Sequence, residues 1–464
     1  MLRDNVLEPG FVQPPGGQPL GGLLDSAADR PAESRAAAPA WSPARRFLFR
    51  FGFSYLLLYI LPFPLSVLPW VGASLAKPYK ALWDALVPWV GGQVFHVNIT
   101  IRPNGSGDTT YNYVQVFAYL VLALAAALVW TLLDRRRPGY ERLHEWLRVY
   151  VRFYLAMTMF SYGIVKVIQL QFPSPGLDRL LQPFGTSSPM GLLWTFMGAS
   201  ALYTFFAGAS EVLGGLLLTT RRTTLLGALV SIGVLTNVVM LNFSYDVPVK
   251  LFSSHLLAMA VFLAAPDLRR LADLFLFNRP AVLPADRPLF ARRWSHQGTL
   301  ALRTAAVLLV VGSGTLEAVK ASKTDGELAP KPPLYGIWNV DEFVADGQAR
   351  PPLLTDKLRW QRVIFDFPGY AEVQLMGDPE DDSLRYYPAK LDEKAKLLTL
   401  TKGRKDKTKW KSVLSYTQPD PGHLVVEGTF DGHKIRTTLH RIDRSKYLLV
   451  NRGFHWINER PFNR

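Results

Sequence analysis

Apolar segments close to twenty residues long recur through the first 320 residues, and they constrain the fold more than any other feature. A helix needs about 20 predominantly apolar residues to cross a bilayer. Seven segments approach or exceed that length: residues 46–69, 113–133, 149–170, 192–218, 223–243, 248–265 and 299–319. The sequence therefore predicts a membrane α-helical bundle of about seven transmembrane helices.

Arginine clusters indicate the orientation of this bundle. Cytoplasmic loops carry an excess of Lys and Arg, and four Arg clusters fall on one side of a seven-helix topology. Their members are Arg45, Arg46 and Arg50, then Arg135–Arg137, Arg142 and Arg148, then Arg221 and Arg222, and finally Arg269, Arg270, Arg279, Arg287, Arg292 and Arg293. We expect an inner or plasma membrane protein with a cytoplasmic N-terminus. The net charge of +15 then reflects topology, and no nucleic-acid partner is expected.

Composition changes along the chain indicate four regions. Residues 1–44 are rich in Pro, Gly and Ala, which is typical of a disordered tail, here cytoplasmic. Residues 45–320 form the transmembrane domain, and the Pro-containing residues 321–333 are expected to be a semi-extended linker. Residues 334–464 consist of short alternating runs separated by turn residues, which predicts an extracytoplasmic antiparallel β-barrel or sandwich. The last expected strand is Tyr447–Val450.

Two loops on the expected outer side have patterns of their own. Residues 77–89 combine Lys77 and Lys80 with Trp83 and Trp89, which is typical of an amphipathic helix at the membrane interface. Residues 172–184 hold a short amphipathic turn between prolines. That segment either dips back over the mouth of the bundle or forms an ordinary surface loop.

Gly336-Ile-Trp338 opens the first expected strand. It resembles the Gly-x-Trp that begins lipocalin-like barrels, in which the Trp closes the barrel floor beneath an Arg from the last strand. The resemblance assigns that role to Arg452 and implies an apolar ligand in the barrel. The alternative is that Trp338 only fills a β-sheet core.

Polar residues inside the apolar segments suggest a ligand-binding site within the bundle. A charge near mid-bilayer costs about 2.5–3.5 kcal/mol on insertion scales, so such residues usually face a polar interior. At a rise of about 1.5 Å per residue, several polar side chains from separate helices fall at one level, roughly 6–12 Å below the outer surface. They are Lys166, Asn237, His255, Tyr162 and Tyr203.

Glu211 falls deeper, roughly 20 Å below that surface, so it is not expected to contact Lys166 directly. Simpler roles are open for each candidate. Lys166 can extend its ammonium to the surface, and Asn237 or His255 can hydrogen-bond a neighbouring helix.

The chain has no cysteine, which excludes disulfides, thiolate catalysis and Cys-based metal or iron–sulfur sites. His255 has no second His at the spacing of a helical metal or haem site. We therefore expect no metal. Any redox function would need a bound organic cofactor or a partner protein.

Two motifs resemble a known membrane family. Ser161-Tyr-Gly163-Ile-Val-Lys166 is similar to the first helix of DoxX-like proteins, and Ala209-Ser-Glu211-Val-Leu-Gly214-Gly215, followed by Arg221-Arg222, is similar to their next helix. The resemblance covers about residues 149–275 and implies a four-helix core with Lys166 and Glu211 at its functional positions. Some members are linked to quinone-coupled thiosulfate oxidation or to oxidative-stress complexes. A more distant resemblance is to bacterial membrane domains related to vitamin K-dependent carboxylases.

Two functions of different classes follow. The first is an accessory or binding protein that holds a quinone or lipid in the polar site. Its partners would be membrane lipids and a membrane or periplasmic protein complex, and its β-domain would recognise a partner or an apolar ligand. The second is a quinone-linked membrane oxidoreductase, or carboxylase-like enzyme, that uses Lys166 or His255 in proton transfer. The first is preferred because the sequence contains no complete set of acid, base and nucleophile.

Overall fold

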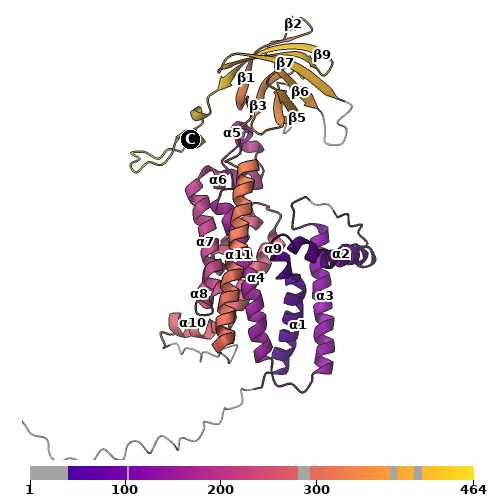
Figure 1. Cartoon of the computed structure of the whole chain (residues 1–464), viewed down its shortest axis with the longest axis vertical. Coiled ribbons are helices and arrows are strands. Elements are labelled where there is room, and N and C mark those ends of the chain that lie inside the picture. The colour runs from indigo at the N-terminus through magenta and orange to yellow at the C-terminus, as the bar shows by residue number, and fades with distance from the viewer. Residues whose placement is uncertain (1–39, 102–103, 281–292, 377–383, 402–409, 464) are drawn as a thin grey trace, which may run out of the picture.

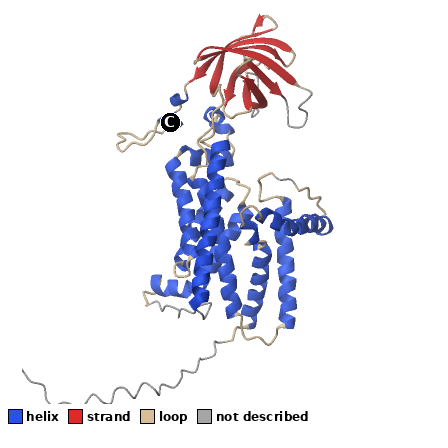
Figure 2. Cartoon of the chain, viewed as in Figure 1, coloured by secondary structure: helices blue, strands red, loops and turns tan. Residues whose placement is uncertain are grey.

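A helical bundle with a β-barrel at one end makes up the protein (Figure 1). The computed structural model describes residues 40–101, 104–280, 293–376, 384–401 and 410–463. Figure 2 shows that the strands belong to the barrel and the long helices to the bundle. The expected N-terminal tail lies outside the described residues as far as residue 39. Trp41 falls within the expected tail, but its side chain is buried ahead of the first helix.

The bundle is built from long helices joined by short helical turns. The long helices are α1 (Pro43–Ile60), α2 (Gly72–Val90), α3 (Thr110–Leu133), α4 (Glu141–Val167), α6 (Pro189–Ala199), α7 (Ala201–Thr219), α8 (Thr224–Ser244), α9 (Lys250–Ala264), α10 (Leu268–Phe275) and α11 (Arg293–Asp325). The short turns are η1 (Leu65–Val67), η2 (Gly91–Phe95), α5 (Leu177–Leu181), η3 (Phe184–Thr186) and η4 (Ala265–Asp267).

Six helical stretches of the described chain are long and apolar enough to cross a membrane. They are Pro43–Val67, Thr110–Leu133, Ala201–Thr219, Thr224–Ser244, Lys250–Phe275 and Leu300–Asp325. They correspond to six of the seven expected spans, so the prediction of a membrane protein is confirmed.

The seventh expected span, residues 149–170, corresponds to the second half of the 27-residue helix α4, which ends at Val167 and is about 40 Å long. α4 is less apolar because it carries Glu141, Arg148, Arg152 and Lys166 along its length. It contacts α1, α7, α9 and α11 and buries Leu155 completely. A charged helix is therefore at the centre of the bundle, with apolar helices around it.

Two of the expected helix boundaries are wrong. The single helix expected over 192–218 is divided at Ser200, whose side-chain oxygen accepts a hydrogen bond from the Tyr203 backbone N–H at 3.2 Å and begins α7. The expected linker 321–333 is helical at its start, because α11 continues to Asp325.

The amphipathic helix expected over residues 77–89 is confirmed as α2. Its Trp83 and Val87 are buried, and the Trp83 ring meets the edge of Tyr119 in α3 with the ring centroids 4.6 Å apart. Its opposite face exposes Leu82 and Trp89.

The C-terminal domain is a closed up-and-down barrel, which settles the choice between barrel and sandwich. Its strands are β1 (Gly336–Ala345), β2 (Gln348–Ala349), β3 (Trp360–Phe365), β4 (Tyr370–Leu375), β5 (Leu384–Asp392), β6 (Leu397–Thr401), β7 (Lys411–Asp420), β8 (His423–Phe430) and β9 (His433–Ile442). Each strand pairs antiparallel with the next around the barrel, β1 pairs with β9 to close it, and the two-residue β2 extends one end of β1.

Aromatic and aliphatic side chains fill the barrel interior among the described residues. Trp338, Phe343, Trp360 and Phe430 are buried in one cluster with aliphatic residues from the other strands. Eight strands enclose a space that such side chains can fill. The interior of this barrel is therefore a packed core.

The residues of the lipocalin-like resemblance have different partners from those expected. The Trp338 indole N–H donates to the Leu334 carbonyl at 2.8 Å. The arginine opposite Trp338 on the last strand is Arg441, and not Arg452. Arg452 follows the last strand, in a segment whose expected strand Tyr447–Val450 is instead the short helix α12 (Leu448–Asn451) after η5 (Arg444–Lys446).

The segment over residues 172–184 contacts both the bundle and the barrel. Phe172 is buried against Leu193 and Met197 of α6. Leu177 of α5 is buried against Ile337 and Ile364, which face outward from the barrel. The Leu177 backbone N–H donates to Asp366 Oδ2 at 2.9 Å, and the Tyr386 hydroxyl donates to Asp178 Oδ2 at 3.3 Å. This contact joins the helical and β-domains.

Candidate functional site

Two glycines bring α4 and α7 into close contact at the end of the bundle nearest the barrel. A Cβ added to Gly163 would lie 2.7 Å from the Gly208 carbonyl oxygen, and one added to Gly208 would lie 2.6 Å from the Gly163 carbonyl oxygen. Helices approach this closely where small residues line the interface. The next residue on the same face of each helix is three positions further on, at Lys166 and at Glu211.

Lys166 and Glu211 form a buried ion pair. Lys166 Nζ donates to Glu211 Oε2 at 2.9 Å, and the two residues are 7% and 3% exposed. The expectation that these residues do not touch is therefore wrong. α7 begins at Ala201 and not near residue 192, so Glu211 lies closer to the barrel end than the count along one long helix implied.

Side-chain direction also brings the pair together. Side chains on a helix lean toward its N-terminus. α4 and α7 are antiparallel, so Lys166 leans away from the barrel end while Glu211 leans toward it. Each side chain therefore covers part of the axial distance that separates the two Cα atoms.

Tyr162 lies beside the pair, as expected. Lys166 Nζ also donates to the Tyr162 carbonyl at 3.4 Å and lies 5.5 Å from the centre of the Tyr162 ring. The ring is 41% exposed on the bundle surface and packs near Phe252 of α9, with centroids 5.9 Å apart. Tyr162 thus extends from the buried ammonium to the outside of the bundle.

His255 belongs to a second and separate polar cluster, so the expected single site is wrong on this point. Its Nδ1–H donates to the Leu251 carbonyl at 2.6 Å, which leaves Nε2 to accept from the Tyr55 hydroxyl at 2.5 Å. The Tyr59 ring stacks on the imidazole with centroids 4.1 Å apart. His255 therefore faces α1, while Lys166 faces α7.

Asn237 and Tyr203 lie on the outside of the bundle, away from both clusters. Asn237 is exposed on α8. Tyr203 is 40% exposed and packs on Phe196 and Phe206. They were grouped with Lys166 because they were expected at the same depth in the membrane. Depth does not determine whether a side chain faces the inside or the outside of the bundle.

Sequence reasoning missed two buried polar contacts. Arg152 is buried in α4, and its Nη1 donates to Thr224 Oγ1 at 3.1 Å. Asn242 Nδ2 donates to Ser253 Oγ at 3.0 Å and joins α8 to α9. The signal for Arg152 was a charged residue that lies inside the expected span 149–170, on the helix that also carries Lys166. Within the described residues, no group of three His, Asp or Glu side chains is arranged to hold a metal ion.

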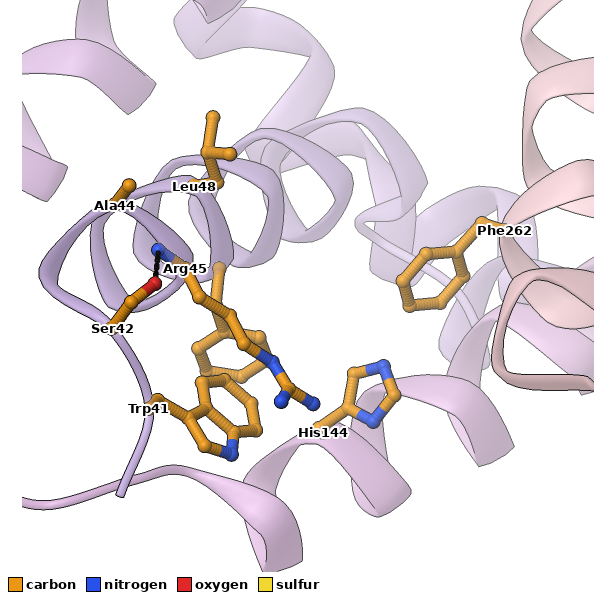
Figure 3. Close-up of a pocket in the computed structure, with 8 residues that line it drawn as sticks. Trp41, Ser42, Ala44, Arg45, Leu48, His144 and Phe262 are labelled. Carbon is orange, nitrogen blue, oxygen red and sulfur yellow. Dashed lines mark hydrogen bonds between the residues drawn. The ribbon is translucent and has the colours of Figure 1, made fainter. Parts of the chain in front are cut away.

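A hollow of about 500 Å³ lies at the other end of the bundle, beside the start of α1 (Figure 3). Figure 3 shows Trp41, Ser42 and Arg45 on one side of it and His144 with Phe262 on the other, where the two rings pack edge to face with centroids 5.7 Å apart. The Arg45 guanidinium lies 4.2 Å from the centre of the Trp41 ring. This hollow has no contact with the Lys166–Glu211 pair, and the sequence carried no motif that predicted it.

Comparisons with known proteins bear on the family. No family model matches the chain, and no solved structure matches it. A protein of Bacillus subtilis (strain 168), named "Uncharacterized protein YwoB", is 32% identical over 126 residues, which cover 79% of that protein and 27% of this chain. DoxX-like membership stays a prediction. The chain belongs to the same family as YwoB.

Proposed function

We propose that the protein is an integral membrane accessory or binding protein that holds an oxygen-bearing amphipathic molecule, a quinone or a lipid headgroup, at the Lys166–Glu211 pair. The observation that carries this proposal is the buried ammonium of Lys166. An ammonium has three N–H donors. Among the described residues, Glu211 and the Tyr162 carbonyl accept two of them, which leaves the third for a carbonyl or phosphate oxygen of the ligand.

The cost of burying these charges supports a functional role for the pair. Removing two charges from water costs several kcal/mol per ion, and a buried ion pair is often no more stable than apolar residues of the same volume. Charged residues inside membrane bundles therefore usually mark ligand or ion sites. Tyr162 provides an amphipathic ring at the bundle surface, where a molecule dissolved in the bilayer would arrive.

The proposed topology makes α4 the seventh transmembrane helix, inside a DoxX-like four-helix core. The Arg clusters then lie in the cytoplasm and the barrel lies outside the cytoplasmic membrane. Because the barrel interior is a packed core, we propose that the barrel recognises a protein partner through its outer surface, in preference to an apolar ligand inside.

A quinone-linked oxidoreductase is the second candidate, and the Tyr55–His255 hydrogen bond of 2.5 Å favours it. A short hydrogen bond between a phenol and an imidazole is a suitable arrangement for moving a proton. In that function His255, beside α1, and Lys166, beside α7, would act as two separate proton-transfer groups. A bound quinone whose redox state changes on substrate addition would favour this candidate.

Mass spectrometry of co-purified quinones and lipids tests the proposal. Wild type is compared with two variants. The double variant Lys166→Met/Glu211→Leu removes both charges and leaves no unpaired ion. The control variant Asn237→Ala alters an exposed polar residue outside the site. We expect one quinone or lipid species to be lost from the double variant and retained in Asn237→Ala. Equal content in all three proteins would contradict the proposal.

A further inference from the structure

The segment after β9 presents large apolar side chains to the outside. Phe454, Trp456 and Ile457 are 76%, 90% and 77% exposed, and the α12 residues Leu448 and Leu449 are exposed as well. The Phe454 and Trp456 rings pack edge to face, with centroids 5.0 Å apart. All five side chains lie within residues 448–457.

The polar groups of this segment bond to one another. Arg452 Nη2 donates to Asn458 Oδ1 at 2.7 Å, and Arg452 Nη1 lies 3.0 Å from His455 Nε2. Asn458 Nδ2 donates to the His455 carbonyl at 3.2 Å, and the Arg452 guanidinium lies 4.6 Å from the Phe462 ring centre. Arg452, His455 and Asn458 are therefore paired with one another, while the large apolar side chains of the segment are exposed. Exposed apolar patches of this kind mark interaction sites.

Its place in the molecule matches the expected edge of the bilayer. The segment leaves the base of the barrel and extends sideways at the level of α5, between the barrel and the bundle (Figure 1). Arg444 Nη2 lies 3.5 Å from the Pro175 carbonyl and fixes the start of the segment to the α5 loop. α6 and the barrel-side end of α11 lie near this level, whereas α1 and α3 end further from the barrel (Figure 1). Aromatic residues concentrate at membrane–water boundaries.

We propose that residues 447–463 are a membrane anchor that inserts Phe454, Trp456 and Ile457 into the headgroup region of the leaflet on the barrel side. Arg460 flanks the inserted residues and would meet anionic lipid phosphates, because apolar insertion and basic side chains together hold interfacial segments on anionic bilayers. This anchor is independent of the site at Lys166. It would hold the barrel at a fixed height and angle above the membrane.

A nitroxide label on the full chain tests the anchor. The natural sequence has no cysteine, so Ile457→Cys supplies a single labelling site, and Gln348→Cys at the far end of the barrel supplies a matched control. Both proteins are reconstituted in phosphatidylcholine vesicles containing phosphatidylglycerol. The experiment then measures how accessible each label is to two reagents. Oxygen dissolves in lipid, and a nickel chelate stays in water.

We expect the label at position 457 to be open to oxygen and shielded from the chelate, and the label at 348 to be open to the chelate. A label at 457 that is open to the chelate would overturn the anchor. A label shielded from both reagents would also overturn it, because the segment would then pack against protein. Two changes should weaken the anchor: Arg460→Gln, and the use of vesicles without phosphatidylglycerol. Each should lower the ratio of immersed to exposed label at position 457 about fivefold, since one basic residue near an anionic surface contributes about 1 kcal/mol. No change would refute the electrostatic part.

Discussion

Gly163 of α4 faces Gly208 of α7 so closely that a Cβ on either residue would collide with the backbone of the other. Lys166 and Glu211 each lie three residues further along the same helix face, and their side chains meet at 2.9 Å. The glycine contact thus sets the distance over which the ion pair forms. Backbone packing and the buried charges are one structural unit.

Substituting Gly163 by Ala should destabilise the bundle. The added methyl would lie 2.7 Å from the Gly208 carbonyl oxygen, and overpacking of a tight interface typically costs about 1–3 kcal/mol. Gly233→Ala in α8 is the matched control, because nothing lies within 4 Å of its added Cβ and alanine favours a helix by roughly 1 kcal/mol. Thermal unfolding in detergent, followed by helical circular dichroism, measures both. Equal melting temperatures would contradict the close contact.

Removing one charge of the buried pair should cost more stability than removing both. Lys166→Met leaves Glu211 buried without a cation, and breaking a buried pair costs about 3–5 kcal/mol. Lys166→Met/Glu211→Leu leaves no unpaired charge, so its stability should return to within about 1 kcal/mol of wild type. Denaturation of the purified variants gives both values. A double variant as unstable as the single variant would mean that the two side chains do not interact.

The barrel should lose stability as pH rises, because of a buried carboxyl on the face that contacts α5. Glu372 is buried on the outward face of β4, and burial, with the negative charges of Asp178 and Asp366, raises its pKa from 4.5 to about 8. A raised folded-state pKa stabilises the folded protein fully below pH 4.5, and this contribution is lost as pH rises through 8. Each unit of pKa shift corresponds to about 1.36 kcal/mol, so the loss is on the order of 5 kcal/mol.

Barrel unfolding at pH 5, 7 and 9, followed by near-ultraviolet circular dichroism, measures this dependence. Glu372→Gln should flatten the decline between pH 5 and 9. Burial raises the pKa of Asp366 as well, so part of the decline should remain. A wild-type barrel that gained stability across this range would refute the assignment.

Leu177→Ala should release the α5 loop from the barrel. Leu177 is 1% exposed, and truncating a buried leucine to alanine costs about 2–5 kcal/mol. We expect faster proteolysis within residues 172–184, with the barrel itself still folded. Leu180→Ala, at a partly buried position in the same helix, should have a smaller effect. Unchanged cleavage in Leu177→Ala would show that α5 does not hold the barrel.

The general architecture could be predicted from the sequence because it depends on local patterns. Helix lengths follow from apolar runs, and the barrel strands from alternation between turns such as Asp431-Gly432. The division of one expected helix at Ser200 depended on a single capping hydrogen bond. The segment Tyr447–Val450 was expected to be a strand, but the barrel closes through β1 and β9 and leaves no strand edge for it to join.

The polar site could be predicted only in part. Lys166 and Glu211 were identified as candidates because charges in apolar helices are rare, and the structure places both inside the bundle. Their pairing was missed because it depends on side-chain direction and on the Gly163–Gly208 approach. His255 was grouped with Lys166 by depth alone, whereas the rotation of α9 directs its imidazole to Tyr55.

The central claim is that α4 crosses the membrane and carries Lys166 inside it. Arg136 is exposed before α4, and Gln348 lies in the barrel. The chain between them contains five helices that would cross the membrane: α4, α7, α8, α9 and α11. Single cysteines at these two positions, labelled with a membrane-impermeant maleimide in sealed vesicles of one orientation, test this directly. Five crossings place Arg136→Cys and Gln348→Cys on opposite sides, so we expect only one of them to react before the vesicles are opened. Reaction of both from the same side would mean four crossings and would exclude α4 from the membrane.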